Sequence, residues 1–90
     1  MKFEWDDEKN AANKKKHGIS FETAAKVFAD PYYIEVYDSE HSAEEDRYIA
    51  LGLVEDVLFV VFTERKEAIR LISARLATEI ERRFYYDSEV

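Results

Sequence analysis

One stretch, Val57 to Arg75 (VLFVVFTERKEAIRLISAR), constrains the fold of this chain more than any other. An apolar run rich in valine and phenylalanine ends in charged residues, and a second strand-like run follows at once. β-Branched and aromatic residues suit a pleated, half-buried surface, and the apolar positions here lack helical spacing. The stretch therefore predicts a β-hairpin with its turn at Glu64–Glu67.

The register of this hairpin determines which side chains enter the core. With Arg65 and Lys66 at the tip, Thr63 is expected to face Ala68. Because strand residues alternate between the two faces, one apolar set then lies together. The expected core positions are Leu58, Val60, Phe62, Ile69 and Leu71. The opposite face is expected to carry Thr63 and Arg70.

Composition predicts one small globular domain that spans residues 1–90. Hydrophobic residues make up 47% of the chain and aromatic residues 14%, which is enough to build a core. The absence of cysteine excludes disulfides, thiolate metal sites and a cysteine nucleophile. No apolar run approaches the roughly 18 residues of a membrane span, and Met1 to Asp6 lacks a signal-peptide core. We expect a cytoplasmic protein with no membrane association.

The charge distribution is uneven. A net charge of −7 opposes nucleic-acid binding in general, because phosphate contacts dominate such affinity. Six of the acidic residues lie between Glu35 and Asp46. The basic residues concentrate in Lys14–Lys16, Arg65–Lys66, Arg70–Arg75 and Arg82–Arg83. An acidic total can therefore coexist with a basic patch.

The first helix is predicted to begin after Asp6 or Asp7, whose side chains can accept hydrogen bonds from its free amides. It should end at about Lys16, with Gly18 as its left-handed stop. Its polar stripe has helical spacing and contains Asn10, Asn13, Lys14 and His17. Only two alanines are apolar, so packing alone does not account for this helix.

The remaining pattern predicts an α+β domain. Residues 2–5 alternate like an edge strand, and a second helix is expected at about 21–28. Strands follow at 32–37 and 47–53, before the hairpin. A last helix has a Thr78–Glu81 capping box and is expected to dock through Leu76, Ile80 and Phe84. The order gives a mainly antiparallel sheet, with a short N-terminal strand and a four-stranded meander, covered by two N-terminal helices and one C-terminal helix.

The arginines around the hairpin are the main candidate site. Arg65 and Arg75 lie at its two ends and Arg70 on its second strand, with Thr63 and Ser73 between them. Guanidinium groups bind phosphate in a bidentate manner, stay charged, and suit stabilisation of a phosphorane-like transition state. Taken singly, each arginine is equally consistent with an ordinary surface residue.

Two further residues extend this candidate site. Arg47 opens the strand expected beside the hairpin. His17, at the end of the first helix, has two interpretations: a cation that complements the helix dipole, or a group that moves a proton near neutral pH. The two histidines lie far apart, and residues 38–46 lack the glycine of an EF-hand loop. We expect a solvated acidic loop there, with no metal site and no cofactor.

Several motifs together resemble the BrnT family of toxins, which belong to type II toxin–antitoxin pairs. The resemblance covers about Phe3 to Tyr86. Its most specific pieces are WD at 5–6, Asn13 with KHG at 16–18, SFE at 20–22, DP at 30–31 and ISAR at 72–75. It implies a RelE-like fold and a metal-independent endoribonuclease that halts translation, with the RNA 2′-hydroxyl as nucleophile.

The resemblance also implies partners and residue roles. The toxin would be neutralised by a BrnA-type antitoxin with a ribbon-helix-helix part. It would contact operator DNA only indirectly, through that antitoxin. The implied catalytic residues are Lys16, His17, Arg47, Arg65 and Arg75. The implied RNA phosphate contacts are Thr63, Arg70 and Ser73. The alternative is a non-catalytic relative that acts only as an antitoxin-binding module, with its acidic surface facing a basic partner.

Overall fold

A five-stranded mixed sheet with strand order β1-β5-β4-β3-β2 organises residues 1–88, which are the residues described by the computed structural model. The strands are β1 (Phe3–Glu4), β2 (Ile34–Tyr37), β3 (Tyr48–Val54), β4 (Asp56–Arg65) and β5 (Ala68–Leu76). The helices are α1 (Asp7–His17), α2 (Phe21–Ala24) and α3 (Glu79–Asp87), with 3₁₀ segments η1 (Ala25–Ala29) and η2 (Ser39–His41). Strands β2 to β5 form an antiparallel meander, and β1 pairs in parallel with β5. The predicted α+β class is confirmed.

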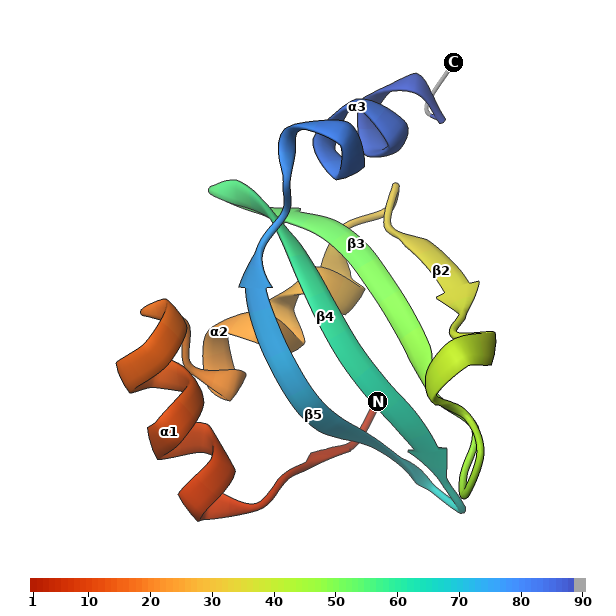
Figure 1. Ribbon diagram of the computed structural model, residues 1–90. Helices are drawn as coiled ribbons and strands as arrows, with labels where there is room; N and C mark the ends of the chain where they lie inside the picture. Colours follow the sequence, from red (N-terminus) through yellow and green to blue (C-terminus); the bar gives the residue numbers. More distant parts are fainter. Residues whose placement is uncertain (89–90) are drawn as a thin grey trace.

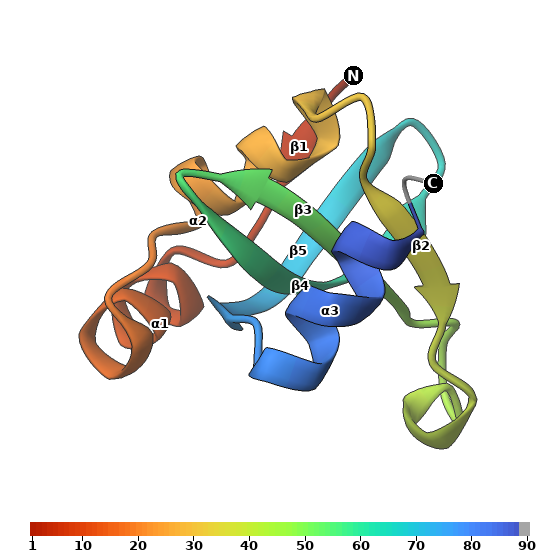
Figure 2. The same ribbon diagram turned by 90° about the horizontal axis from the view of Figure 1, so that it is seen from above.

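The helices leave one face of the sheet largely open. Figure 1 shows α2 behind the sheet, α1 beside β5, and α3 at the end where β5 finishes. Seen from above in Figure 2, α2 lies on one side of the sheet, while α3 and the η2 turn lie toward the other. The main core fills the space between α2, η1 and the sheet, and includes Phe21, Val27, Leu58, Val60, Phe62 and Leu71. The opposite face is the open one.

The predicted hairpin forms, but its expected register is wrong. Strands β4 and β5 pair Arg65 with Ala68, so the turn consists of Lys66 and Glu67. Thr63 consequently pairs with Arg70 rather than with Ala68. The charged residues at 64–67 are compatible with either turn, and only the pairing of β4 with β5 shows which one forms.

A bulge in β5 changes which side chains reach the open face. Phe62 pairs with Leu71, but the next residue, Val61, pairs with Ser73, so Ile72 is an extra residue on β5. Strict alternation from the buried Leu71 would direct Ser73 and Arg75 into the core. Because a bulge reverses the alternation beyond it, both residues lie instead on the open face. The core position passes to Ala74, which is fully buried.

The polar stripe of α1 has a structural explanation. Asn13 is only 8% exposed, and its amide donates to the carbonyls of Ile19 and Ala74 at 2.9 and 2.8 Å. Its oxygen accepts from the Ala74 amide at 3.1 Å, so the side chain pairs with the edge of β5 as a neighbouring strand would. Asn10 accepts from the Phe21 amide at 2.8 Å. Hydrogen bonds, rather than apolar packing, therefore fix this helix.

The expected helix ends are confirmed. Asp6 accepts hydrogen bonds from the Glu8 and Lys9 amides at the start of α1, and Gly18 ends the helix with φ 73°. Thr78 and Glu81 form the predicted capping box of α3. Each signal depends only on residues within a few positions of one another, which is why the sequence alone reveals it.

The second predicted helix is shorter than expected. α2 covers only Phe21–Ala24 and continues as the 3₁₀ segment η1. In η1, Val27 is fully buried and packs on Gly52 of β3, where a Cβ added to the glycine would lie 2.5 Å from Val27 Cγ1. The close approach of η1 to the sheet therefore requires glycine at this position.

We expect Gly52→Ala to lower the free energy of unfolding by about 1–3 kcal/mol, the usual cost of overpacking a core. The added methyl group would also lie 3.0 Å from the Val27 carbonyl oxygen, which a side-chain rotation cannot relieve. Urea denaturation measures the effect. The double variant Gly52→Ala with Val27→Ala should lose less than the sum of the single changes, and strict additivity would contradict the proposed clash.

The docking of α3 differs from the prediction. Leu76, Ile80 and Phe84 are exposed, and Ile80 is 81% exposed. Tyr85, 1% exposed, anchors the helix instead, packing with Leu51 and Val57. Helical spacing identified an apolar stripe correctly but could not show that the neighbouring face contacts the sheet.

Asp30 links α3 to the rest of the domain. Its carboxylate accepts hydrogen bonds from the Tyr85 hydroxyl, the Leu53 amide and the Tyr32 amide. Burial raises the pKa of Asp30, but these three hydrogen bonds lower it more, so the net pKa lies below the ordinary value. The carboxylate is therefore charged at neutral pH, and its stabilising contribution is lost only as the pH falls through this lowered value.

Candidate functional site on the open sheet face

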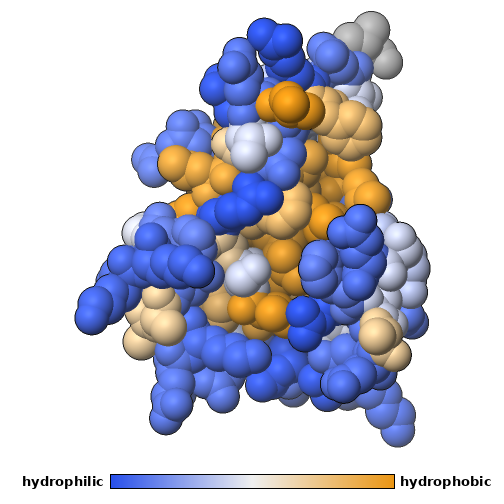
Figure 3. Space-filling model, viewed as in Figure 1, coloured by the Kyte–Doolittle hydropathy of each residue, from blue (hydrophilic) through white to orange (hydrophobic). Residues whose placement is uncertain are grey.

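A hollow of about 440 Å³ lies on the open face of the sheet. Apolar side chains of β3, β4 and β5 form its floor: Ile49, Phe59, Val61 and Ile72. Polar and charged side chains form its rim: Asp38, Glu40, His41, Arg47, Ser73 and Arg75. Figure 3 shows this arrangement as apolar surface surrounded by hydrophilic surface. A second hollow of about 550 Å³ shares His41 and Arg47 and extends toward the acidic loop.

Of the two arginines at the rim, Arg47 has the fewer contacts with other side chains. Within residues 1–88 its guanidinium makes no hydrogen bond or ion pair, and its buried Nε has no acceptor. The backbone is held in place by Ser42, whose hydroxyl accepts from the Arg47 amide at 2.9 Å and donates to the Asp38 carbonyl at 2.5 Å. A desolvated N–H without an acceptor costs about 1–3 kcal/mol. The site therefore holds an arginine that the fold itself does not use.

Arg75 is held in a fixed position. It donates to both carboxylate oxygens of Glu81 at 2.8 and 3.0 Å. Its guanidinium carbon lies 3.8 Å from the centroid of the Phe59 ring. Hydrogen bonds from Arg75 hold the pKa of Glu81 below its ordinary value, so the pair is ionised at neutral pH. Arg75 presents a rigid but partly neutralised cation to the hollow.

A histidine–carboxylate pair lies at the opposite border. His41 Nδ1 is 2.9 Å from Asp38 Oδ2, and the His41 side chain is 64% exposed while that of Asp38 is 14% exposed. This contact occupies Nδ1 and leaves Nε2 available to another partner. Sequence reasoning missed both residues because they lie in a stretch interpreted as a solvated acidic loop. The Asp-x-x-His spacing was the available signal, but it is common and weak.

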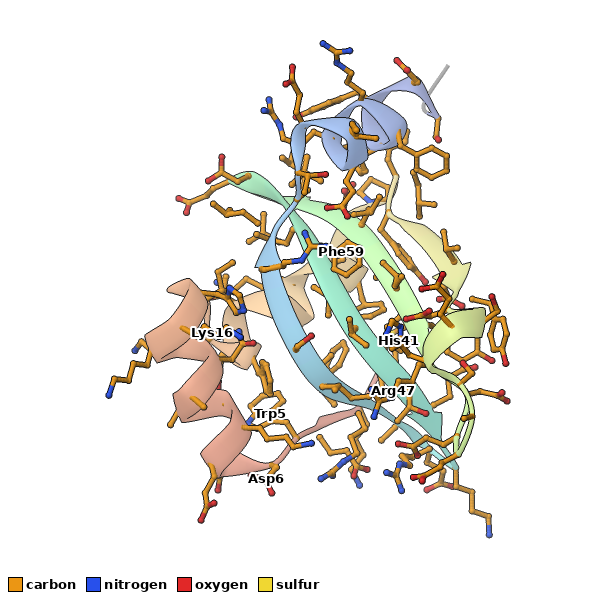
Figure 4. All side chains as sticks on the ribbon, in the orientation of Figure 1. Trp5, Asp6, Lys16, His41, Arg47 and Phe59 are labelled. Carbon is orange, nitrogen blue, oxygen red and sulfur yellow. The ribbon has the colours of Figure 1, made fainter. Side chains whose placement is uncertain are left out.

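Three of the residues implied by the resemblance meet in this hollow: Arg47, Ser73 and Arg75. Lys16 and His17 lie elsewhere, in the exposed last turn of α1. Figure 4 shows Lys16 beside β5, across the sheet face from His41 and Arg47, with Phe59 farther along the sheet toward α3. Lys16 and His17, which the resemblance implies are catalytic, are therefore not part of the hollow's lining.

The hairpin tip also lies apart from the hollow. Arg65 pairs with Glu45 at 3.4 Å, and Arg70 pairs with Glu4 at 2.8 Å. Thr63 is 2% exposed, and its hydroxyl donates to the Asp46 carbonyl at 2.6 Å. These contacts occupy all three polar groups, so the structure gives each of them a structural partner. The predicted catalytic role of Arg65 and the predicted RNA phosphate contacts of Thr63 and Arg70 stay predictions.

The described part of the chain offers no side-chain cluster suited to a metal ion. Residues 1–88 contain no group of three or more histidine, cysteine, aspartate or glutamate residues placed to bind one. Over the same residues, no helix has the length and apolar character needed to cross a membrane.

The fold and the hollow define a small α+β domain whose open sheet face offers cations, an imidazole and an apolar floor to a ligand. A sequence model of the family described as "Ribonuclease toxin, BrnT, of type II toxin-antitoxin system" matches residues 5–81. The chain belongs to this family, and the resemblance found from its motifs is confirmed. Membership makes it a toxin of the ribonuclease type and implies an antitoxin partner. No protein with a curated description matches the chain at a significant level.

Proposed function

We propose that the protein is a metal-independent endoribonuclease that binds RNA across the open sheet face and thereby inhibits translation. One observation supports this most strongly. A single hollow brings together an arginine without an internal partner, a second arginine and a histidine–carboxylate pair. Such a set can bind a phosphodiester and accept a proton. These are the two requirements for transferring the phosphoryl group from the 5′-oxygen of the RNA to the neighbouring 2′-hydroxyl.

The lining of the hollow suits a nucleotide better than a free phosphate. Arg47 and Arg75 lie at its rim, where they can contact a charged backbone. Ile49, Val61 and Ile72 form an apolar floor on which an unstacked base can rest. Base contacts of this kind favour single-stranded RNA, because bases in a duplex are stacked on one another.

We also propose a BrnA-like antitoxin with a ribbon-helix-helix part as the partner in the cytoplasm. The net charge of −7 supports a basic partner, since opposite charges accelerate association. Operator DNA would be contacted through the antitoxin. The acidic loop beside the hollow would weaken RNA binding at low salt, whereas physiological salt screens charges over about 8 Å.

Induced expression tests the function. We expect growth arrest that is relieved by the co-expressed antitoxin, together with RNA cleavage by the purified protein that is unchanged by EDTA. Loss of cleavage in EDTA that returns on adding Mg²⁺ would contradict metal independence. Cleavage is measured on a labelled single-stranded oligonucleotide and on ribosome-bound message, because the two substrates separate free from ribosome-dependent activity.

The alternative function is a non-catalytic antitoxin-binding module. Its support is the group of acidic residues around Arg47, since Glu40, Glu44 and Glu45 line the two hollows and repel phosphate. This alternative predicts tight antitoxin binding with no growth arrest and no cleavage of either RNA. Growth arrest with cleavage of either substrate would exclude it.

A further inference from the structure

We propose that His41, oriented by Asp38, is the group that accepts the proton from the 2′-hydroxyl of the RNA. The inference rests on the proposed ribonuclease function and assigns its proton acceptor. It places this role in the η2 turn rather than at His17 in the last turn of α1. The basis is geometric: of the two histidines, His41 alone lines the hollow that also holds Arg47 and Arg75.

The contact between the two side chains fixes how the imidazole can act. Asp38 Oδ2 lies 2.9 Å from His41 Nδ1, so the neutral ring carries its proton on Nδ1 and donates it to the carboxylate. Nε2 is then unprotonated and can accept a proton. The same carboxylate stabilises the imidazolium that forms, which is the role of a carboxylate in histidine-based acyl transfer.

The surrounding structure holds this pair in place. The Asp38 amide donates to the Arg47 carbonyl at 2.9 Å, and Ser42 Oγ bridges the Asp38 carbonyl and the Arg47 amide. These bonds connect the backbone of the η2 turn to the residue that precedes β3, so the His41 and Arg47 side chains start from one hydrogen-bonded turn and line the same hollow.

The charges that face His41 come from several elements. Asp38 and Glu40 belong to the η2 region, Glu44 and Glu45 to the following loop, Arg47 to the start of β3 and Arg75 to β5. The imidazole therefore lies among charges of both signs, and the contact with Asp38 is the one that orients it.

The reaction balances with His41, the RNA and one water molecule. The 2′-oxygen bonds to phosphorus as the bond between phosphorus and the 5′-oxygen breaks, and the 2′-hydroxyl proton moves to Nε2. The leaving 5′-oxygen keeps the bond's electron pair and takes a proton from water. The resulting hydroxide combines with the imidazolium proton, which restores neutral His41. The products are a 2′,3′-cyclic phosphate and a 5′-hydroxyl end.

The test is the pH–rate profile of cleavage of a single-stranded oligonucleotide by the purified full-length protein. His41→Ala should lower the rate by about 10²- to 10⁴-fold, the usual contribution of a general base, and should abolish the acid limb between roughly pH 5 and 8. Ser39→Ala, in the same exposed turn but outside the hollow, is the matched control and should reproduce the wild-type profile. Asp38→Asn should keep the limb but move it to another pH, which a purely structural role would not do.

The outcomes separate two failures. A wild-type protein that cleaves RNA together with an unchanged profile in His41→Ala would overturn this inference alone. Loss of the acid limb in His17→Ala but not in His41→Ala would assign the proton transfer to α1 and also overturn it. A wild-type protein that cleaves neither free nor ribosome-bound RNA would overturn the proposed function, and this inference with it. A 5′-phosphate with a 3′-hydroxyl end would exclude the 2′-hydroxyl as nucleophile, because its attack on phosphorus releases a 5′-hydroxyl end.

Discussion

Asn13→Ala should lower the free energy of unfolding by about 3–5 kcal/mol, because truncation leaves buried backbone groups without partners at about 1–3 kcal/mol each. The side chain bonds both the amide and the carbonyl of Ala74, as well as the carbonyl of Ile19. A domain of this length has about 4–13 kcal/mol in total, so the expected loss is a large share of its stability.

Equilibrium urea denaturation measures this effect, with Asn10→Ala as the comparison on the same helix. Asn10 is less buried; it accepts a hydrogen bond from the Phe21 amide and donates one to the exposed Glu22. We therefore expect Asn10→Ala to lower the free energy of unfolding by about 1 kcal/mol, which is typical of a helix cap. Asn13→Asp should be at least as damaging as Asn13→Ala, because a carboxylate would face two carbonyl oxygens. Equal, small losses in the two alanine variants would mean that the β5 edge does not depend on Asn13.

The fold could be predicted from the sequence where the signals are local or periodic. The continuous run of β-branched and aromatic residues from Val57 to Phe62 predicts a strand wherever it lies in a sheet. Gly18 and the Thr78–Glu81 box mark helix ends through contacts within a few residues. The class of fold then follows from the order of elements, since short connections make neighbouring strands antiparallel. The family resemblance adds the same order independently.

The features that were missed depend on contacts between distant parts of the chain. The bulge at Ile72 arises from the pairing of β5 with β4, and nothing in the sequence of ISAR marks it. Asn13 looks like one more polar residue on a polar helix until Ala74, distant in the sequence, is placed beside it. In α3 the buried residue is Tyr85, because the Arg75–Glu81 pair and Asp30 set the rotation of the helix.

The sequence predicted the chemical character of the candidate site but not which residues form it. Arginines with a nearby serine indicate an anion site, and Arg47, Ser73 and Arg75 do share one hollow. Arg65 and Arg70 have the same chemical character, yet they lie outside the hollow and pair with Glu45 and Glu4. Within the hollow, Arg75 pairs with Glu81, whereas the Arg47 guanidinium has no partner among the described residues. That distinction makes Arg47 the most informative residue to change.

Arg47→Met should reduce RNA cleavage by about 10²- to 10³-fold, the usual cost of removing one group that stabilises transition-state charge. The same change should leave the free energy of unfolding unchanged or raise it, by up to about 1–3 kcal/mol, because it removes a buried donor that has no acceptor. Cleavage rates and urea denaturation are both measured on the purified variant. Arg47→Lys keeps the positive charge but loses the planar guanidinium, so its cleavage rate should lie between those of the wild type and Arg47→Met.

The opposite signs of the two effects are what identify a binding residue. Truncating a residue that stabilises the fold lowers the free energy of unfolding of the protein. A residue that binds a ligand can instead destabilise the free protein, and the bound ligand offsets that destabilisation. Arg83→Met is the matched control: this arginine lies in α3 in an exposed pair with Glu79, and its removal should change stability by less than about 0.5 kcal/mol. It lies outside the hollow, so cleavage should be unaffected. If Arg47→Met instead destabilises the domain and cleaves RNA at the wild-type rate, Arg47 is a structural residue, and the phosphate must bind elsewhere on the open face.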